Sequence, residues 1–503
     1  MATQQDAAPA RTGDDGRVRE RGWAPVRHFT ERSVLGLIAV VLLGLGFGVL
    51  LLLVRFHWAP LQRLDSQADN GVNALVAPHP GIVAALQTVA GLGGRGFLIP
   101  LVVVAVTVLL IRRRQRLAIY LVVATVGALL LDPSLKTLVG RIRPMVETPV
   151  ATAPGNSFPS GHALGSMITY GALLLVFLPA VPPRWRKVAI GLVAAIVLAI
   201  GITRIGLGVH YISDVLAGWL LGAAWLGVTA YAFRVWRREA GHPLAHVDDG
   251  LEPEAGPDMK PAAGERRLMP HPWAGAAVIL TGWVMTFGIL YVIGYALTHY
   301  TPNTWLGSFD DGVPRWLQSF RTPALDSVSQ AWSKAGDTHA ILAVSLVFCP
   351  IAIAAWRQWR PVLFLVLAMF GELSLFLLSA AAVGRPRPPV EQLDGQMPTS
   401  SFPSGHIAAT LCLWITIALL VTARTRHWWR WIFVALAVIM PIGVALSRMY
   451  RGEHHPTDVL GAMLLATLWL TVLWWTVRPN AEARTASQAR AEAAAGRAGT
   501  ATT

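Results

Sequence analysis

Long apolar stretches alternate with short polar segments along most of this chain. Stretches of about 20 residues match the length of helix that crosses the hydrocarbon core of a bilayer. The pattern predicts six such stretches in each half, at 33–56, 95–111, 116–140, 161–180, 187–203 and 212–233, and then at 273–297, 338–356, 361–383, 405–423, 428–446 and 457–476. We therefore expect an all-α integral membrane protein with two tandem six-helix bundles and about twelve transmembrane helices.

The polar segments predict how the chain is divided. The expected parts are a cytoplasmic tail (1–32), a first membrane domain (33–234), a cytoplasmic linker (235–272), a second membrane domain (273–478) and a disordered cytoplasmic tail (479–503). The first apolar stretch is too long for a signal-peptide core and no small-residue cleavage site follows it, so it reads as a membrane helix. Residues 57–94 have mixed polarity and predict one amphipathic helix at the membrane surface.

Composition supports the membrane class. Hydrophobic residues make up 54% of the chain and charged residues only 14%, whereas about a quarter of the residues in soluble domains are charged. The net charge of +14 comes largely from Arg and Lys in short loops, so membrane topology explains it better than nucleic-acid binding. Cys349 and Cys412 both lie in apolar stretches and are expected to be core residues rather than a disulfide or metal site.

The cationic loops predict the orientation of the chain in the membrane. With the predicted helices crossing the membrane in turn, these loops all fall on the same side of it. They lie around 112–116, 184–187, 234–271, 357–360, 424–430 and 478. The positive-inside rule makes that side cytoplasmic. The loops at 141–160, 204–211, 385–404 and 448–455 then face outside, in what we expect to be a bacterial plasma membrane.

A short polar motif occurs twice. Pro159-Ser160-Gly161-His162 returns as Pro403-Ser404-Gly405-His406, and the two serines lie 404 − 160 = 244 positions apart. The same offset relates the other polar residues of interest, namely Arg143 and Arg387, Arg204 and Arg448, His210 and His454, and Asp214 and Asp458. We interpret this as an internal duplication, because its period is far longer than that of a solenoid repeat.

Three cations of the first half, Lys136, Arg143 and Arg204, are expected near one membrane interface. Such cations can extend to lipid headgroups. Here, however, Ser160-Gly161 opens a predicted helix, whose free N–H groups favour an anion. Converging Arg and Lys beside a helix N-terminus favour phosphate, and they disfavour a divalent metal.

The histidines add reactive groups to this anion site. His210 and Asp214 are four residues apart, a spacing that can place both on one helical face. A carboxylate that accepts a hydrogen bond from one imidazole nitrogen leaves the other nitrogen free to attack. His162 is then available to protonate a leaving oxygen.

These residues resemble the three-part signature of the type-2 phosphatidic acid phosphatase family, which shares its site with vanadium haloperoxidases. The matching residues are Lys136 and Arg143-Pro144, then Pro159 to His162, then Thr203-Arg204, His210 and Asp214. The resemblance implies a metal-independent phosphatase without a cofactor that acts on lipid phosphates through a phosphohistidine. It implies that His210 is the nucleophile, Asp214 its orienting partner and His162 the general acid. It also implies phosphate binding by Lys136, Arg143, Ser160, Gly161 and Arg204.

The second half repeats the signature with changes. Its expected catalytic residues are His454, Asp458 and His406, and its expected phosphate-binding residues are Arg387, Ser404, Gly405 and Arg448. Ala380 and Phe376 stand where the first half has Lys136 and Asp132, which are one helical turn apart and can pair. Arg451 replaces Leu207, and we weigh two roles for it: partial replacement of the missing lysine, or pairing with Glu453 or lipid headgroups. Glu372, near the middle of a membrane stretch, is either functional or hydrogen-bonded to a neighbouring helix.

The sequence thus predicts a lipid phosphatase with its sites at the outer membrane face. Its substrate would be a phosphomonoester or diphosphate lipid, such as polyprenyl diphosphate, phosphatidic acid or phosphatidylglycerol phosphate. Two alternatives remain open: a lipid phosphotransferase that uses the same residues, and a lipid-phosphate-binding or transport protein. The second half could also be a degenerate copy. No nucleic-acid partner is expected, and the sequence does not indicate an oligomeric state.

Overall fold

The computed structural model describes residues 24–241, 249–259, 269, 271–395 and 397–480. The predicted tails at 1–32 and 479–503 and the predicted linker at 235–272 lie partly outside these residues. The described chain divides into two compact units. One comprises residues up to 103 with 115–256, and the other comprises 104–114 with the residues from 257 onward.

In the first unit, the helix that begins with the Ser-Gly-His motif is central. This helix, α6, packs against α5, α7 and α8, while α1 packs against α8. The helices in this part of the chain are α1 (Ala24–Arg55), α2 (Ala59–Val76), α3 (Pro80–Gly91), α4 (Arg95–Ile111), α5 (Gln115–Val139), α6 (Gly161–Phe177), η1 (Leu178–Ala180), α7 (Pro183–Gly206), α8 (Ile212–Glu239) and η3 (Pro253–Ala255).

The second unit repeats this arrangement around α15, which packs against α14, α16 and α17. The remaining helices of the chain are α9 (Gly256–Met259), α10 (Pro272–His299), α11 (Trp305–Gln318), α12 (Pro323–Ala335), α13 (Thr338–Trp356), α14 (Arg360–Val383), α15 (Gly405–Thr422), α16 (Arg430–Tyr450) and α17 (Pro456–Val477).

Within the residues that the structure describes, twelve helical segments are long and apolar enough to cross a membrane. Many of their large apolar side chains are exposed, such as Leu42 and Leu45 on α1, as expected for helices whose solvent is lipid rather than water. The described residues contain no β-strand. This confirms the predicted all-α membrane fold with two tandem helical bundles.

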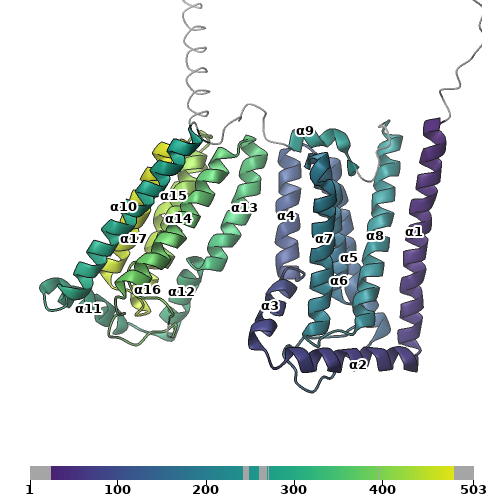
Figure 1. Cartoon of the computed structure of the whole chain (residues 1–503), viewed down its shortest axis with the longest axis horizontal. Coiled ribbons are helices and arrows are strands. Elements are labelled where there is room, and N and C mark those ends of the chain that lie inside the picture. Colours follow the sequence, from purple (N-terminus) through teal and green to yellow (C-terminus); the bar gives the residue numbers. More distant parts are fainter. Residues whose placement is uncertain (1–23, 242–248, 260–268, 270, 396, 481–503) are drawn as a thin grey trace, which may run out of the picture. The chain divides into compact units, whose positions relative to one another are not determined.

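The predicted segment 57–94 contains two helices, α2 and α3. Helix α2 is the one amphipathic helix expected there, whereas α3 belongs to a candidate membrane span, Pro80–Ile111, that begins earlier than the predicted stretch 95–111. Pro80 starts the second helix after a break at residues 77–79, because proline suits the first turn of a helix and not its interior. Helix α2 buries a polar face that carries Asp65, Asp69 and Asn73. It lies across the ends of the longer helices of the first unit (Figure 1).

The duplication extends to helix packing. A Cβ atom added to Gly127 would lie 2.2 Å from the Trp225 ring, and one added to Gly371 would lie 2.0 Å from the Trp469 ring. Each indole nitrogen also donates to a carbonyl one turn before its glycine; Trp225 Nε1 lies 2.9 Å from the Ala124 oxygen. A glycine on one helix therefore admits a tryptophan from another in both units.

Candidate functional site

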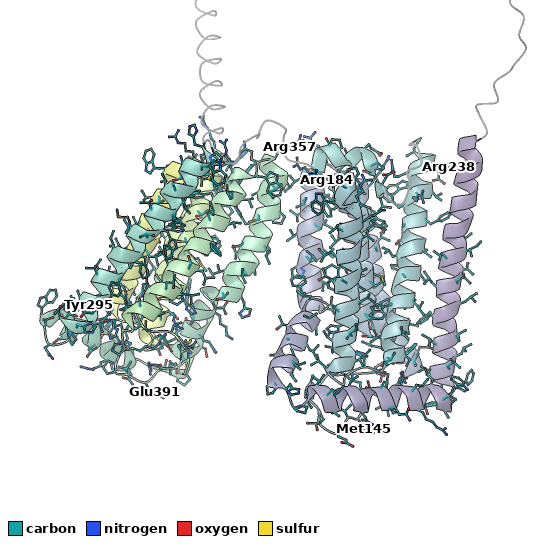
Figure 2. All side chains as sticks on the ribbon, in the orientation of Figure 1. Met145, Arg184, Arg238, Tyr295, Arg357 and Glu391 are labelled. Atoms are coloured by element: carbon teal, nitrogen blue, oxygen red, sulfur yellow. The ribbon has the colours of Figure 1, made fainter. Side chains whose placement is uncertain are left out.

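The predicted residues of the first half converge because three helix ends meet there. Ser160 caps α6, His162 lies in its first turn, Arg204 lies in the last turn of α7, and Asp214 lies in the first turn of α8. The Ser160 N–H donates to the Asp214 carbonyl over 3.0 Å, which joins the starts of α6 and α8. Met145, in the loop before α6, marks this end of the unit in Figure 2, with Arg184 and Arg238 at the opposite end.

His210 lies in the short loop between α7 and α8 and is buried between two charged groups. Its Nδ1 is 3.4 Å from Asp214 Oδ2, and its Nε2 is 3.1 Å from Arg143 Nη1. A guanidinium can only donate hydrogen bonds, so Nε2 must present its lone pair to Arg143 while Nδ1 carries the proton toward Asp214. This tautomer leaves Nε2 as the nucleophilic atom.

Burial also keeps His210 neutral. It lowers the pKa of the His210 imidazole, and this effect outweighs the opposing hydrogen bond and charge of Asp214. The nearby cations Arg143 and Arg204 act in the same direction as burial. An unprotonated imidazole is the form that can attack an electrophile.

Backbone carbonyls hold Arg143 in place. Its guanidinium donates to the carbonyl oxygens of Val209, at 2.7 Å, and of Gly155 and Pro154, both at 3.0 Å. Burial lowers the pKa of Arg143, yet a guanidinium stays charged at any physiological pH. The loop therefore presents a fixed cation beside His210 Nε2.

Two buried polar atoms near His162 have no hydrogen-bond partner among the described residues, Ser160 Oγ and Arg204 Nε. His162 lies close enough to Arg204, His210, Lys136 and Arg143 for their charges to interact. The equivalent second-half atoms, Ser404 Oγ and Arg448 Nε, also have no partner among the described residues, so this feature is common to the two halves.

Among the predicted phosphate-binding cations of the first half, only Lys136 has an acidic partner in the part of the chain that the structure describes. Its Nζ lies 2.9 Å from Asp132 Oδ1, and Arg95 binds the other oxygen of the same carboxylate over 2.7 Å. This confirms the pairing expected from the helical spacing of Asp132 and Lys136. Asp132 also packs against Gly161, where an added Cβ would lie 2.8 Å from its Oδ1.

Sequence reasoning missed a charged network behind Asp214. Arg141 bridges Asp214 Oδ1, at 2.5 Å, and Asp65 Oδ2, at 2.7 Å. Asp65, on α2, also accepts hydrogen bonds from the backbone N–H and the hydroxyl of Ser213. The network fixes the start of α8 and hence the orientation of Asp214.

The duplication carried a signal for this network. Arg385 lies 244 positions after Arg141 and bridges Asp458 Oδ1, at 2.5 Å, and Asp310 Oδ2, at 2.7 Å. Its acidic partner Asp310 is offset from Asp65 by one extra residue, so a search at a constant offset does not find the pair.

In the second half, the histidines and Asp458 lie together but bond differently. His454 Nδ1 donates to the Ser401 carbonyl oxygen over 2.7 Å and is 3.6 Å from Asp458 Oδ2. Asp458 Oδ2 instead accepts hydrogen bonds from the Ser401 hydroxyl and from the His455 backbone N–H. Since a carbonyl only accepts, Nδ1 again carries the proton. His406 lies in the first turn of α15, after its cap Ser404.

The three arginines around the second-half motif, Arg387, Arg448 and Arg451, have acidic partners. Arg387 binds Glu453, with Nη1 3.0 Å from Oε2, and Arg448 binds Asp394, with Nη1 2.5 Å from Oδ2. Arg451 pairs with Asp394, over 2.5 Å, and not with Glu453. The Phe376 ring packs against Gly405, where an added Cβ would lie 2.8 Å from the ring.

Glu372 is buried in α14, and its Oε1 has no hydrogen-bond partner among the described residues. Of the two alternatives considered for Glu372, a hydrogen bond to a neighbouring helix is therefore not made by Oε1. Among the described residues, no three or more His, Cys, Asp or Glu side chains are grouped so that they could hold a metal ion.

Comparison with known proteins gives two matches to one family. The model of the PAP2 superfamily matches residues 117–238 and 361–482. Phosphatidylglycerophosphatase B of Bacillus subtilis is 26% identical over 175 residues, which are 34% of this chain and 85% of that protein. Undecaprenyl-diphosphatase of Sulfolobus acidocaldarius is 32% identical over 154 residues, which are 30% of this chain and 68% of that protein.

A solved structure is also similar, the crystal structure of the first transmembrane PAP2 type phosphatidylglycerolphosphate phosphatase from Bacillus subtilis. The two chains are 24% identical, with a TM-score of 0.36, and the match spans 41% of this chain and 98% of the solved chain. The two family matches and the undecaprenyl-diphosphatase relative decide the assignment. The chain belongs to the PAP2 superfamily, of which it carries two tandem copies.

Proposed function

We propose that this protein is a membrane phosphatase that removes phosphate from lipids, with the chemistry in the first half. One observation carries the proposal. His210 is buried with Nδ1 facing Asp214 and Nε2 facing Arg143, beside an arginine with a buried, unpartnered donor, Arg204. A nucleophilic nitrogen next to unsatisfied cationic donors suits attack on a phosphoryl group.

The substrate phosphate would bind between Arg143, Arg204 and the start of α6. Guanidinium groups bind phosphate oxygens in a forked geometry, and the free N–H groups at a helix N-terminus favour an anion. Lys136 lies at the same site but shares Asp132, so we expect it to contribute less charge than the two arginines. This cationic set supports phosphate binding without a metal.

In the first step, His210 Nε2 attacks phosphorus, and the bond from phosphorus to the lipid oxygen breaks. His162 donates a proton to that leaving oxygen, because the negative charge of the bound phosphate favours a protonated imidazole. Asp214 stabilises the positive charge that develops on the His210 ring.

In the second step, water attacks phosphorus and the phosphorus–nitrogen bond breaks. His162, now neutral, takes the proton from the water. Inorganic phosphate leaves, and His210 returns to its starting form.

The lipid substrate class is supported by the relatives. Their names state phosphatidylglycerophosphatase, undecaprenyl-diphosphatase and lipid A 1-phosphatase activities, which share a phosphate attached to a lipid. In this chain the site lies at the ends of membrane-crossing helices. A lipid could keep its tail in the bilayer while its phosphate meets the arginines.

We propose that the site faces the outside of the membrane. In the first unit, Arg184 and Arg238 lie at the end opposite the site (Figure 2). The positive-inside rule assigns cation-rich loops to the cytoplasm.

The test is inorganic phosphate release by purified full-length protein in lipid micelles. The test substrates are phosphatidic acid, phosphatidylglycerol phosphate and undecaprenyl diphosphate. The wild type is compared with His162→Ala, which lacks the proposed general acid. We expect release from at least one lipid and a loss of about 100-fold or more in the variant. Loss of lipid phosphate without free phosphate, with label on an added alcohol, would indicate a phosphotransferase. No reaction with any of the lipids would contradict the proposal.

A further inference from the structure

The two halves differ in one compact group of three positions beside the arginines. In the first half, Val150, Leu207 and Val209 belong to one apolar cluster. At the same offset of 244 the second half has Asp394, Arg451 and Glu453. An apolar cluster has therefore been replaced by three charged residues, all at the edge of the anion site.

Glu453 is the central change. Its side chain is fully buried, and its Oε2 lies 3.0 Å from Arg387 Nη1 and 3.5 Å from Arg448 Nη2. Its backbone carbonyl accepts from Arg387 over 2.7 Å, as the Val209 carbonyl accepts from Arg143. The backbone is thus conserved between the halves, and the new side chain extends between the two arginines.

Asp394 pairs with two cations of this half, although Arg448 Nε has no hydrogen-bond partner among the described residues. It binds Arg448 and Arg451, each over 2.5 Å. In the first half, neither Arg143 nor Arg204 has a carboxylate within ion-pair distance among the described residues. Lys136, the third cation there, has become Ala380 in the second half.

We propose that the carboxylate of Glu453 occupies the phosphate subsite of the second half, so that this half does not bind a phosphoryl group. A carboxylate and a phosphate oxygen compete for the same guanidinium donors. A phosphate placed there would also meet the negative charge of Glu453 at close range, where charge repulsion in a buried site is strong. The chain would then bind one phosphoryl group, in the first half. This inference rests on the proposed function of the first-half site.

The test counts bound orthovanadate, a phosphate-shaped anion, by calorimetry on the full chain in micelles. Burial raises the pKa of Glu453, against the opposing charges of Arg448 and Arg387, so the titration is performed at pH 8 to keep the carboxylate ionised. We expect one vanadate per wild-type chain and two per Glu453→Val chain, because valine is the first-half residue at this position.

Two matched variants separate charge from size. Glu453→Gln keeps the size of the side chain and removes its charge, and it should also gain a site. The reciprocal change Val209→Glu should remove binding at the first half, while Val209→Gln should retain more of it. Thermal unfolding of each variant shows whether it is folded.

The inference is decided by the difference between Glu453→Val and wild type, and the proposed function is decided by wild type itself. One additional vanadate in the folded variant supports the inference. An unchanged number, or two vanadates bound to wild type, overturns it. A wild-type chain that binds none contradicts the proposed function, and a gain of one in the variant would still support the inference.

Discussion

At the residue scale, the first-half site depends on side chains that do not touch its phosphate subsite. Arg141 holds Asp214 and Asp65 together. Burial opposes the charge of Arg141, but Asp214 and Asp65 outweigh it and raise the pKa of its guanidinium. Asp214 in turn faces His210 Nδ1. The orientation of His210, the proposed nucleophile, is therefore set by a chain of charged contacts.

Arg141→Ala should lower kcat by about 100-fold, because a small displacement of catalytic groups is costly. KM should change little, since Arg141 does not reach the proposed phosphate subsite. Arg141→Lys, which keeps the charge but not the two-pronged geometry, should recover part of kcat. Arg385→Ala is the matched second-half control and should retain wild-type phosphate release. An equal loss in both alanine variants would contradict the assignment.

Asp69 predicts a pH effect on stability. Burial, then the charges of Asp65 and Asp214, raise its pKa to about 7, and both its oxygens are buried without hydrogen-bond partners. An unfolded aspartate has a pKa of about 3.9. At a pH between these two pKa values, Asp69 therefore takes up a proton when the protein folds. The stability of the folded state then falls as the pH rises from about 4 to 7.

Asp69→Asn should remove this dependence. The variant should match wild type near pH 4 and exceed it by up to about 4 kcal/mol at pH 8, from 1.36 kcal/mol per pKa unit. Thermal unfolding in detergent at several pH values measures the difference. Parallel pH profiles for the two proteins would show that Asp69 is not protonated on folding.

The sequence predicted some of these contacts and not others. Asp132 and Lys136 lie one helical turn apart, so their pairing followed from local spacing. Asp65 and Arg141 are 76 positions apart, and no periodicity connects them. The sequence placed Arg451 next to Glu453, but only the fold shows that Asp394 lies closer to its guanidinium.

At the element scale, the site depends on how closely α6 and α8 approach. A Cβ added to Gly218 of α8 would lie 2.8 Å from the Ser160 carbonyl and 2.9 Å from Ala163 Cβ. This glycine lets α8 pack onto the first turn of α6, which carries His162. Helix existence was predictable from hydropathy, whereas this close approach was not. Helix α3 was missed as part of a membrane span because its 12 residues are too few to cross a bilayer alone.

Gly218→Ala should push the two helix starts apart. We expect a loss of about 1–3 kcal/mol in stability, as for other overpacked sites, and a lower kcat. Gly191→Ala on α7 is the control, because an added Cβ there meets nothing within 4 Å; it should be neutral or stabilising. Thermal unfolding and phosphate release measure both effects. Equal behaviour of the two variants would contradict the close-packing argument.

At the scale of the whole molecule, the chain is a duplication whose halves have diverged at the anion site. Both keep the same backbone plan and the same buried arginine–aspartate network. Among the described residues, Arg143 and Arg204 of the first half have no carboxylate partner, whereas Arg387 and Arg448 of the second half do. The duplicated motif was visible in the sequence, but the consequence of Glu453 required the position of its side chain.

The proposed orientation can be tested with single cysteines in a chain that lacks the native ones through Cys349→Ala and Cys412→Ala. Met145 is 90% exposed, in the loop that carries Arg143. Met145→Cys should react with a membrane-impermeant maleimide on intact cells. Arg184→Cys, at the opposite end of the first unit (Figure 2), should react only after permeabilisation. The reverse pattern would place the site in the cytoplasm.

The central claim is that the first half performs the chemistry. Its most direct test is phosphate release from lipid micelles by wild type, His210→Ala and His454→Ala, measured side by side. We predict that His210→Ala abolishes release, because it removes the nucleophile, and that His454→Ala retains the wild-type rate. Release that survives in His210→Ala, or that is lost in His454→Ala, would contradict the account.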